Sequence, residues 1–270
     1  VMRDLPVAQS HNITLMGGEG GTNYTASFSY ENTQGIFKKS ENGEVVGRVN
    51  IGHSMFDGKL TTDLNLVSRW EDRPTGVNHN YMWRQATIRN PTDRIYDDDG
   101  DWQTRGTYFY TNPIQMLGTY GGELESRDLR LHGTVTLRPT DELSFSMLTG
   151  TERGQYLSGT FRTLDNPDTP GINNASRNTS SDESQILELT GTYANVFGGH
   201  QVTVLGGYEY FDRLSEDFGA DNERFPTDLF TYNRLQAGTG LPEGLADMDS
   251  GKSSIKTIGF FGRLNWDWNN

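Results

Sequence analysis

The sequence contains no cysteine, and its positive charges are few compared with its negative ones. Without cysteine the chain forms no disulfide, no thiolate zinc site and no cysteine nucleophile. Its 23 Lys and Arg residues stand against 36 Asp and Glu residues, which gives a formal net charge of −13. Nucleic acids are bound mainly through clustered Lys and Arg, so this balance argues against a nucleic-acid partner.

Long hydrophobic runs are also missing. No window approaches the ~20 apolar residues that a membrane-crossing helix needs, and the mean hydropathy is −0.68. This excludes a membrane protein built of helices but not one built of strands, because alternating strands average to a polar hydropathy. Residues 1–9 show no basic start, apolar run or cleavage site of a signal peptide. We therefore expect the chain to be an internal part of a longer precursor.

Alternation of apolar and polar residues is the strongest pattern in the chain. It predicts nine strands, around residues 13–15, 24–30, 45–51, 60–66, 129–137, 143–147, 187–193, 202–210 and 258–268. Around these positions each expected strand extends over about nine to thirteen residues, close to the 9–11 that a tilted strand needs to cross a bilayer. Soluble strands are nearer five or six residues. The lengths therefore favour strands that cross a membrane.

The connections between these strands alternate between short and long. Short turns are expected at residues 17–22, 56–59, 138–142 and 197–200, and long loops at about 72–126, 154–183 and 214–253. Outer-membrane barrels have short periplasmic turns and longer extracellular loops. The pattern thus predicts an antiparallel transmembrane β-barrel with its long loops outside the cell. The alternative is a soluble antiparallel sheet with one dry face.

The two faces of the predicted strands differ in a way that fits a barrel. The polar face carries charges in mid-strand, which a water-filled lumen permits: Arg48, Asp63, Arg130, Glu188 and Arg263. The apolar face, with Val49, Leu64, Leu131 and Leu264, is expected to contact lipid. Aromatic residues gather near the strand ends, as in interfacial girdles: Trp70, Tyr208 and Tyr210 toward the long loops, and Phe56, Phe197, Trp266 and Trp268 toward the short turns.

Nine strands are not a complete barrel, because bacterial single-chain barrels close with an even number of strands. An open sheet would also leave unpaired edges in lipid, at several kcal/mol per group. We therefore expect further strands at both ends of the chain.

Several motifs resemble one family. Residues 11–18 (HNITLMGG), 22–30 (TNYTASFSY) and 34–36 (QGI) resemble the first barrel strands of SusC/RagA-type TonB-dependent transporters. Residues 89–92 (RNPT), 96–100 (YDDDG) and 111–114 (TNPI) resemble a loop of that family. Residues 225–228 (FPTD) and 259–266 (GFFGRLNW) resemble a later loop and strand. The matches follow in order over nearly the full chain.

The resemblance implies an outer-membrane barrel of about 22 strands filled by a plug, in a Gram-negative bacterium. Residues 1–270 would be part of that barrel domain, with the plug, the TonB box and the C-terminal strands outside them. A SusD-like surface lipoprotein would cover the extracellular loops. Uptake of an oligosaccharide or peptide would be driven through the TonB complex.

No residue pattern predicts an enzyme, a metal site or a cofactor. The acidic run at residues 97–101 fails the EF-hand pattern, because Ile95 and Gly106 occupy ligand positions, so we interpret it as a solvated turn. The histidines show no metal-ligand spacing, and no Gly-x-Ser-x-Gly sequence is present.

Aromatic residues in the longest loop are the candidate binding residues: Trp83, Tyr96, Trp102, Tyr108 and Tyr110. Their flat apolar faces and polar edges suit sugar rings or peptide side chains, or a docking surface for the lid lipoprotein. Alternatively, these aromatic residues pack the loop's own core. Within the same loop, a short helix is expected at residues 79–88.

Two other classes of function remain open at this point. One is an outer-membrane barrel without TonB coupling, such as a porin or adhesin. The other is a soluble carbohydrate-binding β-protein, which would stay monodisperse without detergent because it would expose no large apolar face.

Overall fold

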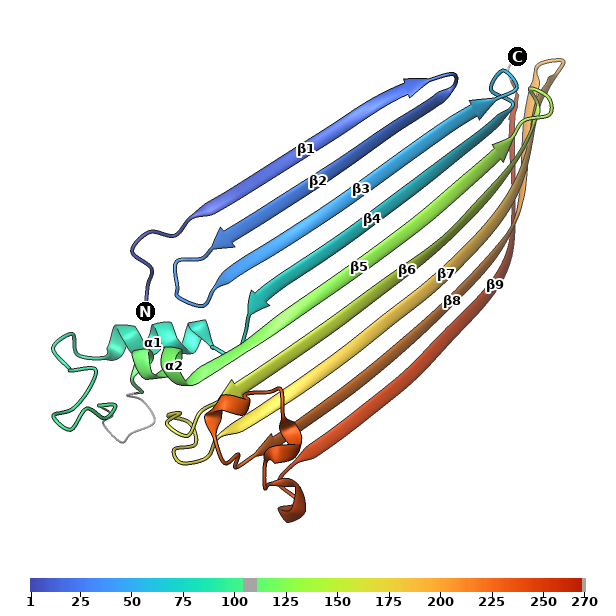
Figure 1. Cartoon of the computed structure of the whole chain (residues 1–270). Coiled ribbons are helices and arrows are strands. Elements are labelled where there is room, and N and C mark those ends of the chain that lie inside the picture. Colours follow the sequence, from blue (N-terminus) through green and yellow to red (C-terminus); the bar gives the residue numbers. More distant parts are fainter. Residues whose placement is uncertain (104–110, 269–270) are drawn as a thin grey trace.

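The computed structural model describes residues 1–103 and 111–268. In these residues nine antiparallel strands form one sheet, and each strand pairs with the next in sequence (Figure 1). The strands are β1 (Ala8–Glu19), β2 (Thr22–Gln34), β3 (Glu41–Met55), β4 (Leu60–Pro74), β5 (Tyr120–Leu137), β6 (Leu143–Arg162), β7 (Asn174–Phe197), β8 (His200–Glu223) and β9 (Asp247–Trp268). The predicted all-β class and the nine strands are confirmed.

All four short turns lie at one end of the sheet, the upper right in Figure 1. Glycines in the left-handed region make the tightest of them: Gly20 and Gly21 have φ of 58° and 82°, and Gly198 and Gly199 have φ of 53° and 90°. Glycine adopts this region without a steric penalty. The other end carries the long connections, with α1 (His79–Ile88), α2 (Pro113–Thr119) and three 3₁₀ turns, η1 (Asp228–Phe230), η2 (Leu235–Ala237) and η3 (Leu241–Glu243). The predicted segregation of short and long connections is therefore present.

The pairing register sorts the side chains onto two faces, because residues directly opposite in an antiparallel pair point the same way. Gly52 pairs with Asp63, Val67 with Arg130, and Leu148 with Glu188. Leu205 pairs with Arg263. Followed across the sheet, these pairs place the five charged residues predicted to face a lumen, including Arg48, on one face. That this face lines an aqueous lumen stays a prediction.

The opposite face is apolar over most of its area. It carries Val49, Leu64, Leu131 and Leu264, which were predicted to contact lipid. Its side chains are strongly exposed on this chain: Ile13 is 72%, Leu264 is 68% and Phe260 is 80% exposed. Such a continuous exposed apolar face is typical of the lipid-facing side of a transmembrane sheet.

β1 (12 residues) and β2 (13 residues) have the predicted length of nine to thirteen residues, whereas β3 to β9 are longer. β5 has 18 residues, β6 has 20, β7 and β8 have 24 each, and β9 has 22. The connections without strand are correspondingly shorter, at residues 75–119, 163–173 and 224–246. Strand pairing continues beyond the last apolar alternation, where polar side chains cover both faces. Cross-strand ion pairs such as Arg153–Glu183 (3.0 Å) and Lys252–Glu216 (2.6 Å) join these extensions.

In the described part of the chain, no helix has the length and apolar character needed to span a membrane. Both helices belong instead to the long-loop end. There Met82, Met116, Leu117 and Tyr120 form a small buried cluster. The main side-chain core of this chain therefore lies beside the ends of the strands rather than on the sheet.

Candidate functional site

The two helices of the long β4–β5 connection are fixed by asparagine caps. The side chain of Asn78 accepts from the backbone N–H of Tyr81 (3.0 Å) at the start of α1. Asn112 caps α2 by accepting from the N–H of Ile114 (3.1 Å), and Pro113 occupies the first turn. These are the residue types that favour helix N-termini. Helix α1 has the predicted bounds of 79–88, whereas α2 was not predicted.

Polar contacts join three connections into one unit. Lys39, from the β2–β3 turn, donates to the carbonyl of Tyr120 (2.6 Å), and burial lowers the pKa of Lys39. Gln115 of α2 donates to the carbonyl of Asp165 in the β6–β7 connection (2.6 Å). Gln85 of α1 accepts from the backbone N–H of Thr111 (3.0 Å). The loop end is therefore a packed structure.

Two of the predicted aromatic residues, Tyr96 and Trp102, lie together. Their ring centroids are 4.7 Å apart, and their backbones form an isolated β-bridge. The acidic run between them folds into a turn in which the Asp97 carboxylate accepts from the N–H groups of Asp99 (3.1 Å) and Asp101 (2.9 Å). This turn therefore holds the two rings in contact, with their planes inclined at 33°.

Trp83 lies in a separate cluster on α1. Its ring centroid is 5.6 Å from that of Phe37, and Phe37 also stacks on His79 at 5.8 Å. Trp83 is 45% exposed, so one side of its ring faces outward. The structure thus brings together two of the five predicted aromatics and separates a third. Tyr108 and Tyr110 lie outside the described residues.

A cavity of about 1130 Å³ opens beside the Tyr96–Trp102 pair. Trp102, Tyr81, Tyr120 and Arg162 are among the residues that line it. The Arg162 guanidinium lies 5.2 Å from the centre of the Tyr120 ring and 3.6 Å from the Asp168 carboxylate, which also lines the cavity. Burial, together with Asp168, raises the pKa of Tyr120, so its phenol stays neutral at ordinary pH. Aromatic faces next to a cation, a carboxylate and a phenol can bind a polar organic molecule.

Sequence reasoning missed Tyr120, Arg162 and Asp168. Residues 120 and 162 were assigned to loops, although they are paired with each other at the ends of β5 and β6. Asn112 followed by Pro113 is a sequence that favours a helix N-terminus, and it was a usable signal for α2. Tyr120 is the residue that directly follows this helix.

Buried asparagines fix the other two connections. Asn166 is fully buried, donates to the carbonyls of Thr163 (2.8 Å) and Ile172 (2.9 Å), and accepts from the N–H of Thr169 (2.8 Å). Asn173 accepts from the N–H of Phe225 (2.7 Å), which ties the β6–β7 and β8–β9 connections together. Satisfied buried amides of this kind hold a loop in one conformation.

Charged side chains form networks on the polar face of the sheet. Arg69 lies 2.8 Å from Glu44 and 2.6 Å from Glu71, and Glu152 lies 3.9 Å from Arg130 and 3.3 Å from His132. Glu188 is directly opposite Glu209 in the register, a like-charge pair that only a well-hydrated face accommodates readily. Among residues 1–103 and 111–268, no group of three or more His, Asp and Glu has metal-binding geometry.

No protein-family model matches the chain. Two curated proteins of Formosa agariphila are similar to it: TonB-dependent receptor P26, 23% identical over 264 residues and 94% of this chain, and TonB-dependent receptor P3, 21% identical over 277 residues and 95% of this chain. The chain spans 26% of the length of each. The resemblance to TonB-dependent transporters drawn from the motifs is therefore confirmed.

Solved structures show the same fold. The RagAB peptide importer in its open-open state matches 97% of this chain with a TM-score of 0.78 and 20% identity, and the RagAB peptide transporter matches with a TM-score of 0.76. The match covers 30% of the RagAB chain. The nine strands therefore have the fold of part of a TonB-dependent receptor barrel.

Proposed function

We propose that this chain is part of the barrel of an outer-membrane TonB-dependent importer, which takes up oligosaccharides or peptides with a SusD-like surface lipoprotein. The observation that carries the proposal is the match of 97% of the chain to the fold of part of a peptide importer, with a TM-score of 0.78. The proteins it resembles are receptors and transporters rather than enzymes. On this proposal residues 1–270 are barrel wall, and the plug and the TonB box belong to other parts of the protein.

The loop end supports a role in capture. Its cavity combines the aromatic faces of Trp102 and Tyr81 with the charges of Arg162 and Asp168, which suits sugar rings or peptide side chains. Asparagine caps and buried amides hold the loops around the cavity in place. Binding would therefore lose little free energy to the ordering of these loops. Trp83 is exposed and is not among the cavity-lining residues, which favours a contact with the lid lipoprotein.

Uptake by the full-length protein tests the proposal. A strain with the intact gene should import labelled oligosaccharide or peptide, and loss of TonB should abolish this import. Import that continues without TonB would identify a porin instead. A chain that stays monodisperse without detergent would identify a soluble protein.

Partner capture is measured separately. Affinity purification of the tagged full-length protein from the outer membrane should recover a lipoprotein encoded beside it. Recovery of the barrel alone, under conditions in which uptake is intact, would contradict the proposal that a lipoprotein covers the extracellular loops.

A further inference from the structure

A recess lies on the apolar side of the sheet, above the lipid-facing band. It has a volume of about 360 Å³ and is formed by the polar extensions of β5, β6, β7 and β8. On the register, Glu125, Leu157, Thr179 and Phe218 form one row across these strands, and Arg127, Gln155, Ser181 and Glu216 form the next row. These eight side chains point outward, the same way as Leu131 on β5.

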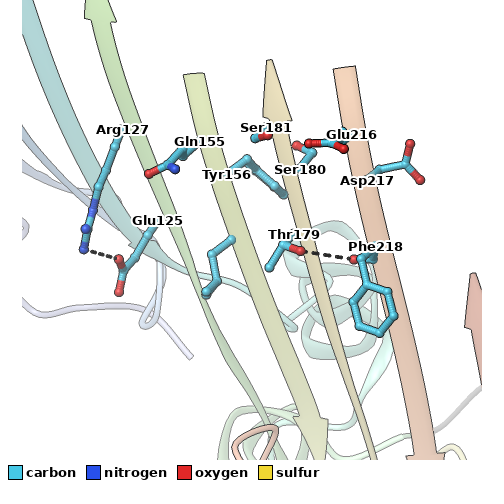
Figure 2. A pocket seen from close by; sticks show the side chains of 11 residues that line it. Glu125, Arg127, Gln155, Tyr156, Thr179, Ser180, Ser181, Glu216, Asp217 and Phe218 are labelled. Atoms are coloured by element: carbon cyan, nitrogen blue, oxygen red, sulfur yellow. Dashed lines mark hydrogen bonds and ion pairs between the residues drawn. The ribbon is translucent and has the colours of Figure 1, made fainter. Parts of the chain in front are cut away.

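The recess exists because short side chains lie between long ones. Thr179 and Ser181 on β7 are flanked by Leu157 and Gln155 on β6 and by Phe218 and Glu216 on β8. Glu125 and Arg127 on β5 lie on the far side of β6 (Figure 2). On β5, Arg127 donates to Glu125 (3.0 Å), which fixes these two side chains to each other. The hydroxyl of Thr179 is turned to the carbonyl of Phe218 at 3.5 Å. The result is a furrow along β7.

Its position follows from the strand geometry. Arg127 is two residues from Leu129 on the outward face of β5, about 7 Å at the usual rise of ~3.3 Å per residue. On β8, Phe218 is eight residues beyond Tyr210, about 26 Å along a strand tilted by ~45°. The recess therefore begins just above the hydrocarbon and extends through the level of the lipid headgroups and beyond.

Ion pairs mark the boundary below the recess. Arg153–Glu183 (3.0 Å) and Lys256–Asp212 (3.1 Å) lie on the outward face between the apolar band and the recess. Paired charges of both signs suit a layer that carries phosphates and hydroxyls. They do not suit hydrocarbon, in which a charge costs about 2–4 kcal/mol.

The lining has the chemistry of a sugar site. The carboxylates of Glu125 and Glu216, the amide of Gln155 and the hydroxyl of Ser181 supply acceptors and donors for sugar hydroxyls. Leu157 and Phe218, the latter 49% exposed, supply an apolar surface for the face of a ring.

We propose that this recess binds a sugar residue of the glycolipid in the outer leaflet around the barrel. The inference rests on the proposed outer-membrane location, and it goes beyond nutrient import because the recess is on the outside of the wall. A bound headgroup would tie the barrel to its lipid ring and fix its depth in the membrane.

The test uses the full-length protein in detergent and native mass spectrometry with two probes. One probe is lipopolysaccharide that carries core sugars, and the other is lipid A without them. Ser181→Trp fills the recess, and Thr151→Trp is the matched control on the outward face of β6, below the recess. We expect the wild type and Thr151→Trp to retain the core-bearing lipid about tenfold more tightly than Ser181→Trp, a difference of ~1.4 kcal/mol. Retention of lipid A should be equal in all three.

Equal retention of both lipids by the wild type, or no loss in Ser181→Trp, overturns the proposal. If a free core oligosaccharide binds the recess as tightly as the intact glycolipid, the proposal that the bound sugar belongs to a membrane lipid is overturned. If Ser181→Trp fails to assemble, Phe218→Ala replaces it, with the same expected loss. Uptake is measured in parallel, so a failed importer and a failed glycolipid site are distinguishable.

Discussion

The ring of Tyr232 lies directly on the bare backbone of Gly159, where an added Cβ atom would be 2.2 Å from Cδ2 of the tyrosine. The Tyr232 hydroxyl also donates to the Glu123 carboxylate (2.9 Å). The β8–β9 connection is thus attached to the outward face of β5 and β6.

Replacing Gly159 should detach this connection. In Gly159→Ala the new methyl group cannot share space with the Tyr232 ring, so the segment around Tyr232 should leave the wall and become more sensitive to protease, while the barrel still assembles. Gly206→Ala is the control, because a Cβ atom at Gly206 meets nothing within 4 Å. Equal cleavage of the two variants would contradict the attachment.

The attachment should also depend on pH. Burial and the hydrogen bond to Glu123 raise the pKa of Tyr232 to about 12, above its ordinary value of 10.0. The neutral phenol is therefore favoured in the folded state, and its contribution is complete below pH ~10 and is lost as pH rises through ~12. Protease sensitivity of residues 224–246 should increase across this window in the wild type. Tyr232→Phe should lack the step, since its hydrogen bond is already gone at every pH.

The two faces of the sheet can be compared at neighbouring positions. Leu64→Arg places a charge on the apolar face and should cost about 2–4 kcal/mol of folding free energy in lipid. Asn65→Arg, on the charged face, should cost far less because its side chain meets water. Urea unfolding of the full-length protein in bilayers measures both. Similar losses in the two variants would show that the strand faces are assigned wrongly.

The two separated aromatic clusters should affect different readouts. Trp102→Ala removes the partner of the Tyr96 ring and one wall of the cavity, so substrate affinity should fall about threefold to tenfold. Trp83→Ala should leave substrate affinity unchanged and weaken recovery of the lipoprotein partner. If neither variant changes either measurement while the barrel assembles, these aromatics only pack the loop itself.

The faces and order of the strands were predictable from the sequence because the side-chain period of two is a local property. The start of α1 was likewise local, since Asn78 precedes it as a cap. The full extent of β6 to β9 was not predictable in the same way. Beyond the apolar band both faces of these strands are polar, so alternation ends while backbone pairing continues.

The cavity depended on contacts between distant segments and was therefore out of reach of the sequence. Tyr120 and Arg162 are 42 positions apart, yet strand pairing sets them opposite each other. The Tyr96–Trp102 pair depends on the turn between them. Its acidic residues were recognised as a turn, but they gave no indication that the two rings are in contact.

The unequal strand lengths give the loop end a sloping rim. β1 has 12 residues and β7 has 24, although their short turns lie at one end of the sheet (Figure 1). At ~3.3 Å per residue the wall is about 40 Å longer along β7 than along β1. A large molecule that approaches from the β1 side therefore passes over a low wall and then meets a high one at β7. The opening of this part of the barrel is therefore inclined toward β1, and its aromatic residues lie between the low side and the high side.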